Sequence, residues 1–371
     1  MKRIILSGGG TGGHIYPAVT IAREILAIEE DAEILFVGTA RGMESRIIPA
    51  EGFRFESLSA AGIQRRFTLS NIKALGKAGA GLWEARGILK KFRPDVVIGT
   101  GGYVCGPILM TAALSHIPTL VQEQNVIPGI TNKILSRVVD RVALGYEEAK
   151  ARFPRPDKCV YTGNPVRAEV TKIGREEARE KLGVSPDTFM VLSAGGSRGA
   201  RSINSAMVGV HRRFKDEKNL YIRHVTGTDG FETVKEALGD VSDTGEWGNV
   251  SRIVSYENDM PTALAAADLV IYRAGAVGLA ELSARGLASV LIPYPYAAED
   301  HQTYNARVFE KNGAAVVIAD AELTDEKLIS AIETLREDPQ KLKEMASAAL
   351  RIGNVHAGRD IAQMALSLAD R

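Results

Sequence analysis

Cysteine is scarce in this sequence of 371 residues, which contains only Cys105 and Cys159. Their spacing fits neither a metal site nor a redox pair, which excludes a disulfide framework and is compatible with a reducing compartment. Residues 96–115 form the one long uncharged stretch, but glycines and a proline interrupt it. We interpret it as a strand, a glycine loop and a helix, so we expect no membrane-spanning helix. We also expect no signal peptide before the first strand.

Several motifs of well-known enzymes are missing as well. There is no Asp-x-Asp, so a metal ion that holds a diphosphate through paired carboxylates is not expected, and we expect no other cofactor. There is no Walker motif and no Gly-x-Ser-x-Gly, which argues against a P-loop kinase and an α/β-hydrolase. The net charge of +1 at pH 7 gives no reason to expect nucleic acid as a partner.

A glycine-rich motif occurs twice in the chain. Residues 8–14 follow the apolar run 4–6, and residues 194–200 follow the apolar run 190–193. Glycine lets the backbone approach a ligand closely, and the N-terminus of the helix expected after each loop favours an anion. The sequence therefore predicts two phosphate-type sites, one at the head of each half.

Short apolar runs alternate with helical patterns, which is typical of buried parallel sheets covered by helices. The predicted strands are 4–6, 34–37, 96–98, 119–122, 141–144, 190–193, 221–225, 250–254, 269–272, 289–292 and 315–318. We predict the α/β class, with two doubly wound Rossmann-like domains facing a cleft. The predicted divisions are 1–164, 165–345 and a C-terminal helix within 346–371 that packs back on the first domain.

The first loop also matches the dinucleotide-binding pattern through Gly8, Gly10 and Gly13. That pattern requires an acidic residue at the end of the second strand, where it holds the ribose hydroxyls. Here the second strand ends in Gly38 and Thr39. Nicotinamide chemistry is therefore disfavoured.

His14 follows the first loop at the mouth of a predicted helix. The helix dipole disfavours an imidazolium there, so a neutral ring that accepts a proton is one interpretation. A histidine that only caps its helix by hydrogen bonding is the other, and the sequence leaves both open.

A third glycine loop, residues 101–107, follows another predicted strand. It either presents backbone N–H groups to a diphosphate or is a tight turn. Residues 123–125 (Glu-Gln-Asn) lie just beyond the next strand, where open α/β sheets place ligand contacts.

In the second half, Glu281 lies on the second turn of a predicted helix that begins among small residues. Its carboxylate could accept hydrogen bonds from a ribose diol, or it could form a surface salt bridge. Arg167, just after the turn between the halves, could reach a phosphate, and residues 300–302 (Asp-His-Gln) follow the next strand.

Residues 63–93 carry eight lysines and arginines against the single acid Glu84. Apolar residues alternate with them, as in a helix that lies on an anionic bilayer. An ordinary solvated helix with one face on the core fits the same pattern, and on the pattern alone it is favoured.

Taken in order, these motifs resemble one family, the bacterial N-acetylglucosaminyltransferases of peptidoglycan synthesis (the MurG family). The resemblance covers essentially the whole chain and rests on residues 9–14, 101–107, 123–125, 163–167, 195–200, 281 and 300–302. It implies the glycosyltransferase B fold, no metal at the nucleotide and inversion of the anomeric configuration. It also implies transfer of N-acetylglucosamine from UDP-N-acetylglucosamine (UDP-GlcNAc) to the MurNAc 4-hydroxyl of undecaprenyl-diphosphate-linked MurNAc-pentapeptide, which converts lipid I to lipid II. Such an enzyme would be cytoplasmic and peripheral on the anionic inner face of the cell membrane.

The resemblance also implies roles for individual residues. His14 would be the catalytic base, with Glu123 as the weaker candidate. The donor would contact Thr11, Gly12, Gly13, Asn125, Arg167, Ser197, Glu257, Arg273, Ala276, Val277, Gly278, Leu279, Ala280, Glu281, His301 and Gln302. The acceptor would contact Gly9, Gly10, Gly101, Gly102 and Tyr103, and the membrane would contact Ile72, Leu75 and Trp83.

Alternatives to this function are another enzyme on the same scaffold, such as a UDP-sugar epimerase or a different glycolipid glycosyltransferase, and a non-catalytic nucleotide-sugar sensor. Cys105 stands where a small hydroxyl residue or glycine would be more usual in the family. A polar side-chain contact at that point of the third loop is therefore left open.

Overall fold

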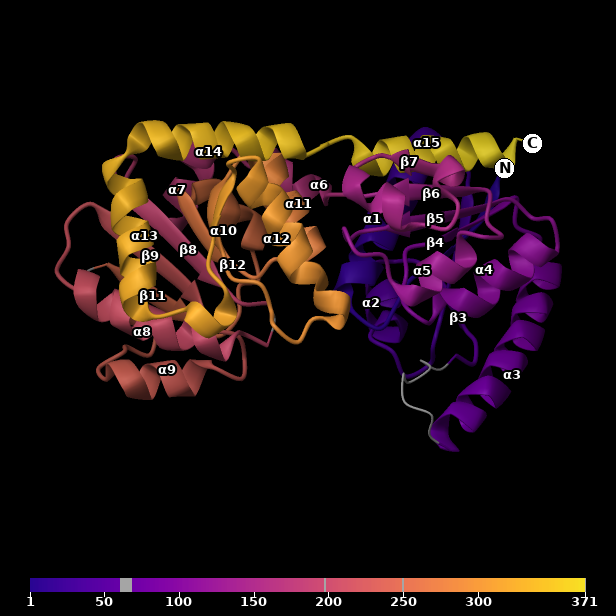
Figure 1. The fold of residues 1–371 in the computed structure, drawn as a ribbon, viewed down its shortest axis with the longest axis horizontal. Coiled ribbons are helices and arrows are strands. Elements are labelled where there is room, and N and C mark those ends of the chain that lie inside the picture. Colours follow the sequence, from indigo (N-terminus) through magenta and orange to yellow (C-terminus); the bar gives the residue numbers. More distant parts are fainter. Residues whose placement is uncertain (61–68, 197, 249, 371) are drawn as a thin grey trace. The chain divides into compact units, whose positions relative to one another are not determined.

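Two units make up the computed structural model of the chain (Figure 1). It describes residues 1–60, 69–196, 198–248 and 250–370, without the side chains of residues 69–78. Unit 1 comprises Met1–Val166 and Val355–Arg371, and unit 2 comprises Arg167–Asn354. The sequence prediction puts the divisions after residues 164 and 345, whereas the contacts put them after Val166 and Asn354.

Unit 1 is built on a parallel sheet with the strand order β3-β2-β1-β4-β5-β6-β7. Its strands are β1 (Arg3–Ser7), β2 (Glu33–Gly38), β3 (Arg54–Ser57), β4 (Val96–Gly99), β5 (Thr119–Glu123), β6 (Arg141–Leu144) and β7 (Cys159–Tyr161). Its helices are α1 (Gly12–Ile28), α2 (Glu44–Ala50), α3 (Leu69–Phe92), α4 (Cys105–Leu114), α5 (Ile130–Leu135) and α15 (Ala357–Ala369), with 3₁₀ turns η1 (Glu147–Arg152) and η2 (Pro156–Lys158).

Alternate residues of the unit 1 strands pack on opposite faces of the sheet, as the two-residue period of a strand requires. Ile4 and Leu6 belong to a core shared with α1 and α15, whereas Ile5 belongs to a core shared with α3 and α4. Both faces are therefore covered, which explains the continuous apolar runs in these strands.

Unit 2 has a second sheet with the order β10-β11-β9-β8-β12-β13-β14, in which only the described pair β10–β11 is antiparallel. Its strands are β8 (Phe189–Ala194), β9 (Leu220–Val225), β10 (Glu246–Trp247), β11 (Ser251–Val254), β12 (Leu269–Tyr272), β13 (Ala288–Leu291) and β14 (Ala315–Val317). Its helices are α6 (Ala168–Lys172), α7 (Arg175–Leu182), α8 (Arg201–Phe214), α9 (Phe231–Leu238), α10 (Met260–Ala266), α11 (Ala276–Arg285), α12 (His301–Lys311), α13 (Asp325–Glu337) and α14 (Pro339–Ile352), with 3₁₀ turns η3 (Ala298–Asp300) and η4 (Asp320–Glu322).

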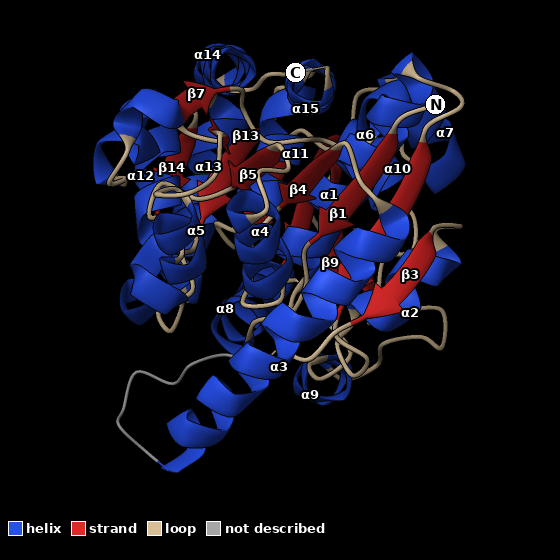
Figure 2. Cartoon of the chain, turned by 90° about the vertical axis from the view of Figure 1, so that its right-hand side faces the viewer, coloured by secondary structure: helices blue, strands red, loops and turns tan. Residues whose placement is uncertain are grey.

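Each sheet has a point at which the strand order reverses. In unit 1, β1 and β4 lie side by side (Figure 2), and the chain proceeds outward from them in opposite directions. In unit 2 the corresponding neighbours are β8 and β12. The connections diverge there, and open α/β sheets bind ligands outside the carboxyl ends of such a pair of strands.

The C-terminal helix α15 packs on α1 and adds Ile361, Ala362 and Ala365 to the core of unit 1. The preceding helix, α14, packs instead on α11 and β13 of unit 2. Within the described parts of the chain, no helix combines the length and the apolar character that a membrane crossing requires.

Candidate functional site

The first glycine loop leads from β1 into α1 at the switch point of unit 1. A Cβ on Gly8 would lie 2.0 Å from Thr100 Oγ1, in the loop that follows β4. Gly10 has φ +85°, a backbone conformation that L side chains rarely adopt. The two predicted loops of unit 1 therefore pack directly on each other, which only glycine permits at residue 8.

Glu44, at the start of α2, fixes the first glycine loop through hydrogen bonds. Its buried carboxylate accepts hydrogen bonds from Gly10 N at 3.1 Å, Thr39 N at 3.0 Å and Thr39 Oγ1 at 2.6 Å. Burial acts to raise the pKa of this carboxyl, but the hydrogen bonds from Thr39 and Gly10 hold it below its ordinary value. The sequence analysis did not identify Glu44; in the structure Gly38 and Gly42, which precede it, have no room for a Cβ beside its side chain.

His14 lies between the first and third glycine loops. Its Nδ1 is 3.1 Å from Gly9 O and 3.3 Å from Thr11 Oγ1. A Cβ on Gly101 would lie 2.9 Å from the ring atom Cδ2, and one on Gly102 would lie 3.3 Å from Nδ1. Because a carbonyl oxygen can only accept, Nδ1 carries the proton of a neutral ring, and Nε2 is then the basic nitrogen.

Glu123, at the end of β5, is buried and organises the loop that follows it. Its carboxylate accepts hydrogen bonds from Asn125 N at 3.0 Å, Asn125 Nδ2 at 3.3 Å, Gly129 N at 3.0 Å and Asn132 Nδ2 at 2.8 Å. The side chain thereby fixes the position of Asn125. Four donors on one carboxylate favour a structural task for Glu123.

Cys105 begins α4 inside the third loop. Its Sγ lies 3.2 Å from Gly102 O, to which the thiol donates. Burial raises the pKa of Cys105 to about 12, so the group remains a neutral donor. Tyr103, in the same loop, is 40% exposed, and its Cε1 would lie 3.7 Å from a Cβ added at Gly10. A polar contact thus exists at the position where Cys105 departs from the usual residue.

The second glycine loop leads from β8 into α8 at the switch point of unit 2. Gly196 and Gly199 have φ of +97° and +83°. A Cβ on Gly199 would lie 1.9 Å from Thr226 O, so the loop rests directly on the backbone after β9. Ser197, a predicted donor contact, lies outside the described residues.

Glu281, on α11, and Arg167 form a bidentate pair within unit 2. Arg167 Nε and Nη2 donate to Glu281 Oε1 at 3.0 and 2.7 Å. Burial raises the pKa of Glu281, and the charge of Arg167 opposes that shift. The structure thus brings together Glu281, which is predicted to contact the ribose, and Arg167, which is predicted to contact a phosphate. Their opposite charges compensate each other.

The residues from Arg273 to Ala280 lie beside this pair, where β12 runs into α11. Gly275 is the N-cap residue of α11, no side chain caps that end, and no acidic residue occupies the first turn. The N–H groups near Ala276 are therefore suited to an anion. Arg273 instead contacts the scaffold: its guanidinium donates to Ile292 O and Pro293 O at 3.1 Å, and it pairs with Asp320.

The predicted donor contacts Glu257, His301 and Gln302 of unit 2 are held by hydrogen bonds of their own. Glu257 Oε2 accepts from Arg223 Nε at 2.5 Å, and its Oε1 accepts from Asp259 N at 3.0 Å. Gln302 Oε1 accepts from Tyr294 N at 2.9 Å, and His301 Nδ1 lies 2.7 Å from Ala298 O. These bonds preorganise the segments after β11 and β13.

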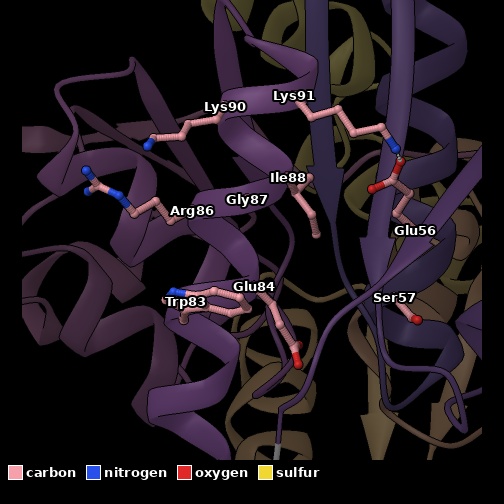
Figure 3. Close-up of a pocket in the computed structure, with 9 residues that line it drawn as sticks. All are labelled: Glu56, Ser57, Trp83, Glu84, Arg86, Gly87, Ile88, Lys90 and Lys91. Carbon is pink, nitrogen blue, oxygen red and sulfur yellow. Dashed lines mark hydrogen bonds and ion pairs between the residues drawn. The ribbon is translucent and has the colours of Figure 1, made fainter.

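A surface pocket of about 550 Å³ lies between β3 and α3 (Figure 3). Its lining residues are Glu56, Ser57, Trp83, Glu84, Arg86, Gly87, Ile88, Lys90 and Lys91. Lys91 pairs with Glu56 at 2.8 Å, whereas Arg86 and Lys90 point away from Glu56. Trp83 is 79% exposed. Ile72 and Leu75 lie on the same helix, but their side chains are outside the described part of the structure.

Among the described residues, no group of three histidine, cysteine or acidic side chains is arranged to hold a metal ion. The structure does bring together, at the switch point of unit 1, the predicted residues Gly9, Gly10, His14, Gly101 and Gly102. In unit 2 it brings together Arg167 and Glu281 beside the N-terminus of α11.

Two Rossmann-like units with glycine loops at their switch points fit the glycosyltransferase B fold, and the comparisons identify the class. Residues 4–144 match the glycosyltransferase family 28 N-terminal domain, and residues 190–364 match the glycosyltransferase family 28 C-terminal domain. The predicted α/β class with two Rossmann-like domains of the glycosyltransferase B fold is confirmed.

Similar proteins identify the family within this class. A protein of Desulfitobacterium hafniense (strain Y51), named UDP-N-acetylglucosamine–N-acetylmuramyl-(pentapeptide) pyrophosphoryl-undecaprenol N-acetylglucosamine transferase, is 48% identical over 369 residues, 99% of each chain. A protein of the same name from Thermoanaerobacter sp. (strain X514) is 47% identical over 366 residues, 99% of this chain and 100% of its own. The crystal structure of Acinetobacter baumannii MurG matches 99% of this chain and 100% of its own, with 27% identity and a TM-score of 0.78. The chain belongs to this family of N-acetylglucosamine transferases.

Proposed function

We propose that this enzyme transfers N-acetylglucosamine from UDP-GlcNAc to the 4-hydroxyl of the muramyl sugar in undecaprenyl-diphosphate-linked MurNAc-pentapeptide. The names of relatives with 44–48% identity describe this transfer for those proteins. The observation in this chain that carries the proposal is the hydrogen bond from His14 Nδ1 to Gly9 O, because it makes Nε2 the proton acceptor at the switch point of unit 1.

In the proposed reaction His14 Nε2 takes the proton of the acceptor hydroxyl as its oxygen attacks C1 of the donor sugar. The bond between C1 and the β-phosphate oxygen breaks, and UDP leaves with the bonding electron pair. Attack opposite the leaving group inverts the configuration at C1. General-base catalysis of this kind contributes about 10²–10⁴ to the rate. Glu123 is a weaker candidate, since four hydrogen bonds already bind its carboxylate.

The charge of the leaving diphosphate would be stabilised without a metal ion. The uncapped N-terminus of α11 would supply backbone N–H groups, as would Gly195 and Gly196 of the second loop, whereas the N–H of Gly199 already donates to Gly196 O at 2.9 Å. Arg167 adds a guanidinium next to them, already held in place by Glu281. Ser197 belongs to the same proposal from the sequence alone.

Glu281 would hold the ribose of the donor. Both hydrogen bonds from Arg167 end on Oε1, so a ribose diol would bind Oε2 or displace the guanidinium. The segment near Glu257 would contact the uracil, and Gln302 and Asn125 the sugar. These segments are held in advance by the hydrogen bonds of Glu257, Gln302 and Glu123.

The acceptor diphosphate would lie against the glycine loops of unit 1, near Gly9, Gly102 and Tyr103. Gly101 and Gly102 have φ of +103° and +80°. In this conformation the backbone N–H groups of the third loop can face an anion. The N–H of Gly10 is bound to Glu44, so we expect neighbouring N–H groups to contact the phosphates.

We further propose that the enzyme works at the cytoplasmic face of the membrane, where α3 contacts anionic lipid. Trp83 is exposed, and Arg86 and Lys90 extend from the same helix away from Glu56 (Figure 3). The acid on this stretch, Glu84, is bound to Ser59 Oγ at 3.0 Å and does not offset them at the surface. Ile72 and Leu75 would extend this contact.

Release of UDP from UDP-GlcNAc, measured with and without a lipid I analogue, tests the proposed transfer. We expect UDP to appear only with the acceptor, in equal amount to disaccharide product. Release without acceptor, together with a 2-epimerised sugar, would indicate an epimerase on the same fold. Donor binding without turnover in the presence of acceptor would indicate a sensor.

A further inference from the structure

Four buried polar side chains form a continuous hydrogen-bonded chain inside unit 2. Ser251 Oγ of β11 lies 2.8 Å from His211 Nδ1 of α8. His211 Nε2 lies 3.1 Å from His224 Nδ1 of β9, and His224 Nε2 lies 3.1 Å from Asn204 Oδ1 of α8. Both histidines are fully buried, and Ser251 and Asn204 nearly so. The chain lies outside the residues assigned above to donor or acceptor.

The direction of every hydrogen bond in this chain follows from its last member. Asn204 Nδ2 donates to Thr226 O at 2.8 Å, so its Oδ1 faces His224 as an acceptor. His224 must then donate from Nε2 and accept at Nδ1, and His211 must do the same. Ser251 completes the chain as the donor to His211 Nδ1.

The chain requires both imidazoles to be neutral. Burial lowers the pKa of His211 to about 3 and lowers that of His224 as well, to which the neighbouring His211 adds. An extra proton on His224 Nδ1 would set two N–H donors against each other, and one on His211 Nδ1 would make the Ser251 hydroxyl turn from donor to acceptor. Each side chain thus fixes the orientation of the next.

The chain ends directly beneath the second glycine loop. Thr226 O, which accepts from Asn204, is the atom that a Cβ on Gly199 would approach to 1.9 Å. A Cβ on Gly227 would lie 2.0 Å from Gly199 N. The turn at Thr226 and Gly227 is therefore the surface on which the described part of the loop rests, and a small shift of that turn would move the loop.

We infer that Asn204, His224, His211 and Ser251 are positioning residues for the UDP moiety of the donor, because they fix the Thr226–Gly227 turn against which the second glycine loop packs. This inference rests on the proposed function, in which that loop faces the donor diphosphate. It assigns a purpose in donor binding to a fully hydrogen-bonded polar chain, and such a chain fixes one arrangement of the groups around it.

The test is Asn204→Ala, which removes the link between the histidines and Thr226. We expect the Kd for UDP, measured by calorimetry, and the donor KM each to rise about tenfold or more, with the acceptor KM within about twofold of wild type. Val184→Ala is the matched control for destabilisation, because Val184 is also buried in unit 2 and packs with Ala178 and Met190, apart from both the chain and the donor segments. Equal weakening of UDP binding in both variants would mean general destabilisation and would overturn the inference.

A second pair of variants changes only the far end of the chain. Ser251→Ala removes the donor to His211 Nδ1 and should weaken UDP binding, whereas Ser251→Thr keeps the hydroxyl and should restore it. Unchanged UDP affinity in Asn204→Ala and Ser251→Ala would overturn the inference but leave the transferase function intact. Failure of the wild-type protein to bind UDP would overturn the proposed function itself.

Discussion

Arg167 and Glu281 are 114 positions apart in the sequence, yet two nitrogen atoms of the arginine share a single oxygen of the glutamate. The glutamate side chain is 6% exposed and the arginine side chain 32%. A nearly buried carboxylate therefore depends on a partner that can still reach solvent. We therefore expect substitution of Arg167 and substitution of Glu281 to have different effects.

We expect Glu281→Ala to raise the donor KM while leaving the acceptor KM unchanged. Arg167→Ala is expected to act on stability. It should lower the free energy of unfolding by roughly 1–3 kcal/mol, because it leaves the buried carboxylate of Glu281 without its guanidinium partner. Steady-state kinetics and urea unfolding measure the two effects. An unaltered donor KM in Glu281→Ala would remove Glu281 from the proposed donor site.

His14→Ala should lower kcat about a hundredfold or more, with UDP-GlcNAc binding little changed, since the ring is proposed to act on the acceptor proton. His116→Asn is the matched control: His116 is an exposed histidine with φ +56°, which asparagine tolerates. Turnover close to wild type in His14→Ala would exclude His14 as the base.

Gly199→Ala should abolish measurable UDP binding for two reasons. The added Cβ would lie 1.9 Å from Thr226 O, and the alanine would have to adopt φ +83°. Gly183→Ala separates the two effects, since Gly183 has φ +68° and no atom within 4 Å of the added Cβ. The control should lose about 1 kcal/mol of stability and keep its UDP affinity. Equal UDP affinity in the two variants would contradict the contact described for Gly199.

Stability should fall as the pH is lowered from about 6.5 toward 3. The pKa values of His211 and His224 are lower in the folded state than in the unfolded chain, so the unfolded state binds more protons in this range. Each histidine then contributes a slope on the order of 1 kcal/mol per pH unit. Urea unfolding of His211→Gln should show a shallower pH dependence than wild type, and an equal slope would exclude the histidine pair as its source.

Trp83→Ala should reduce sedimentation with vesicles of anionic lipid severalfold, and the bound fraction of wild type should fall as salt rises. Tyr296→Ala serves as the control, because Tyr296 is an 83% exposed aromatic residue of unit 2. Binding of Trp83→Ala equal to that of the control would contradict the membrane contact proposed for α3.

Every strand predicted from the sequence appears in the structure, and the strands that were missed are β3, β7 and β10. All three lie at an end of their sheet. β3 carries Arg54 and Glu56 and is partly exposed, and β7 and β10 have only three and two residues. An edge strand is paired on one side only and can be short or partly exposed, so these three lack the continuous apolar run that identifies a central strand. The fourth edge strand, β14, has an apolar run and was predicted.

For the candidate site, local motifs predicted the glycine loops and His14, since a strand, a glycine loop and a helix are consecutive in sequence. The contact of Glu44 with Gly10 joins residues 34 positions apart. It depends on β1 and β2 being neighbours in the sheet, which no local pattern specifies. The bond from His14 Nδ1 to Gly9 O likewise requires the loop conformation, so the sequence could not decide between a base and a capping residue.

The helix α15 carries a consequence for synthesis of the protein. Its residues Ile361, Ala362 and Ala365 complete the core of the unit that the first 166 residues begin. The ribosome must therefore translate all of unit 2 before unit 1 can close its core, a delay on the order of tens of seconds at about 5–20 residues per second. During that interval the part of α1 that α15 covers stays exposed in the nascent chain, so the unit that starts folding first is the last to be finished.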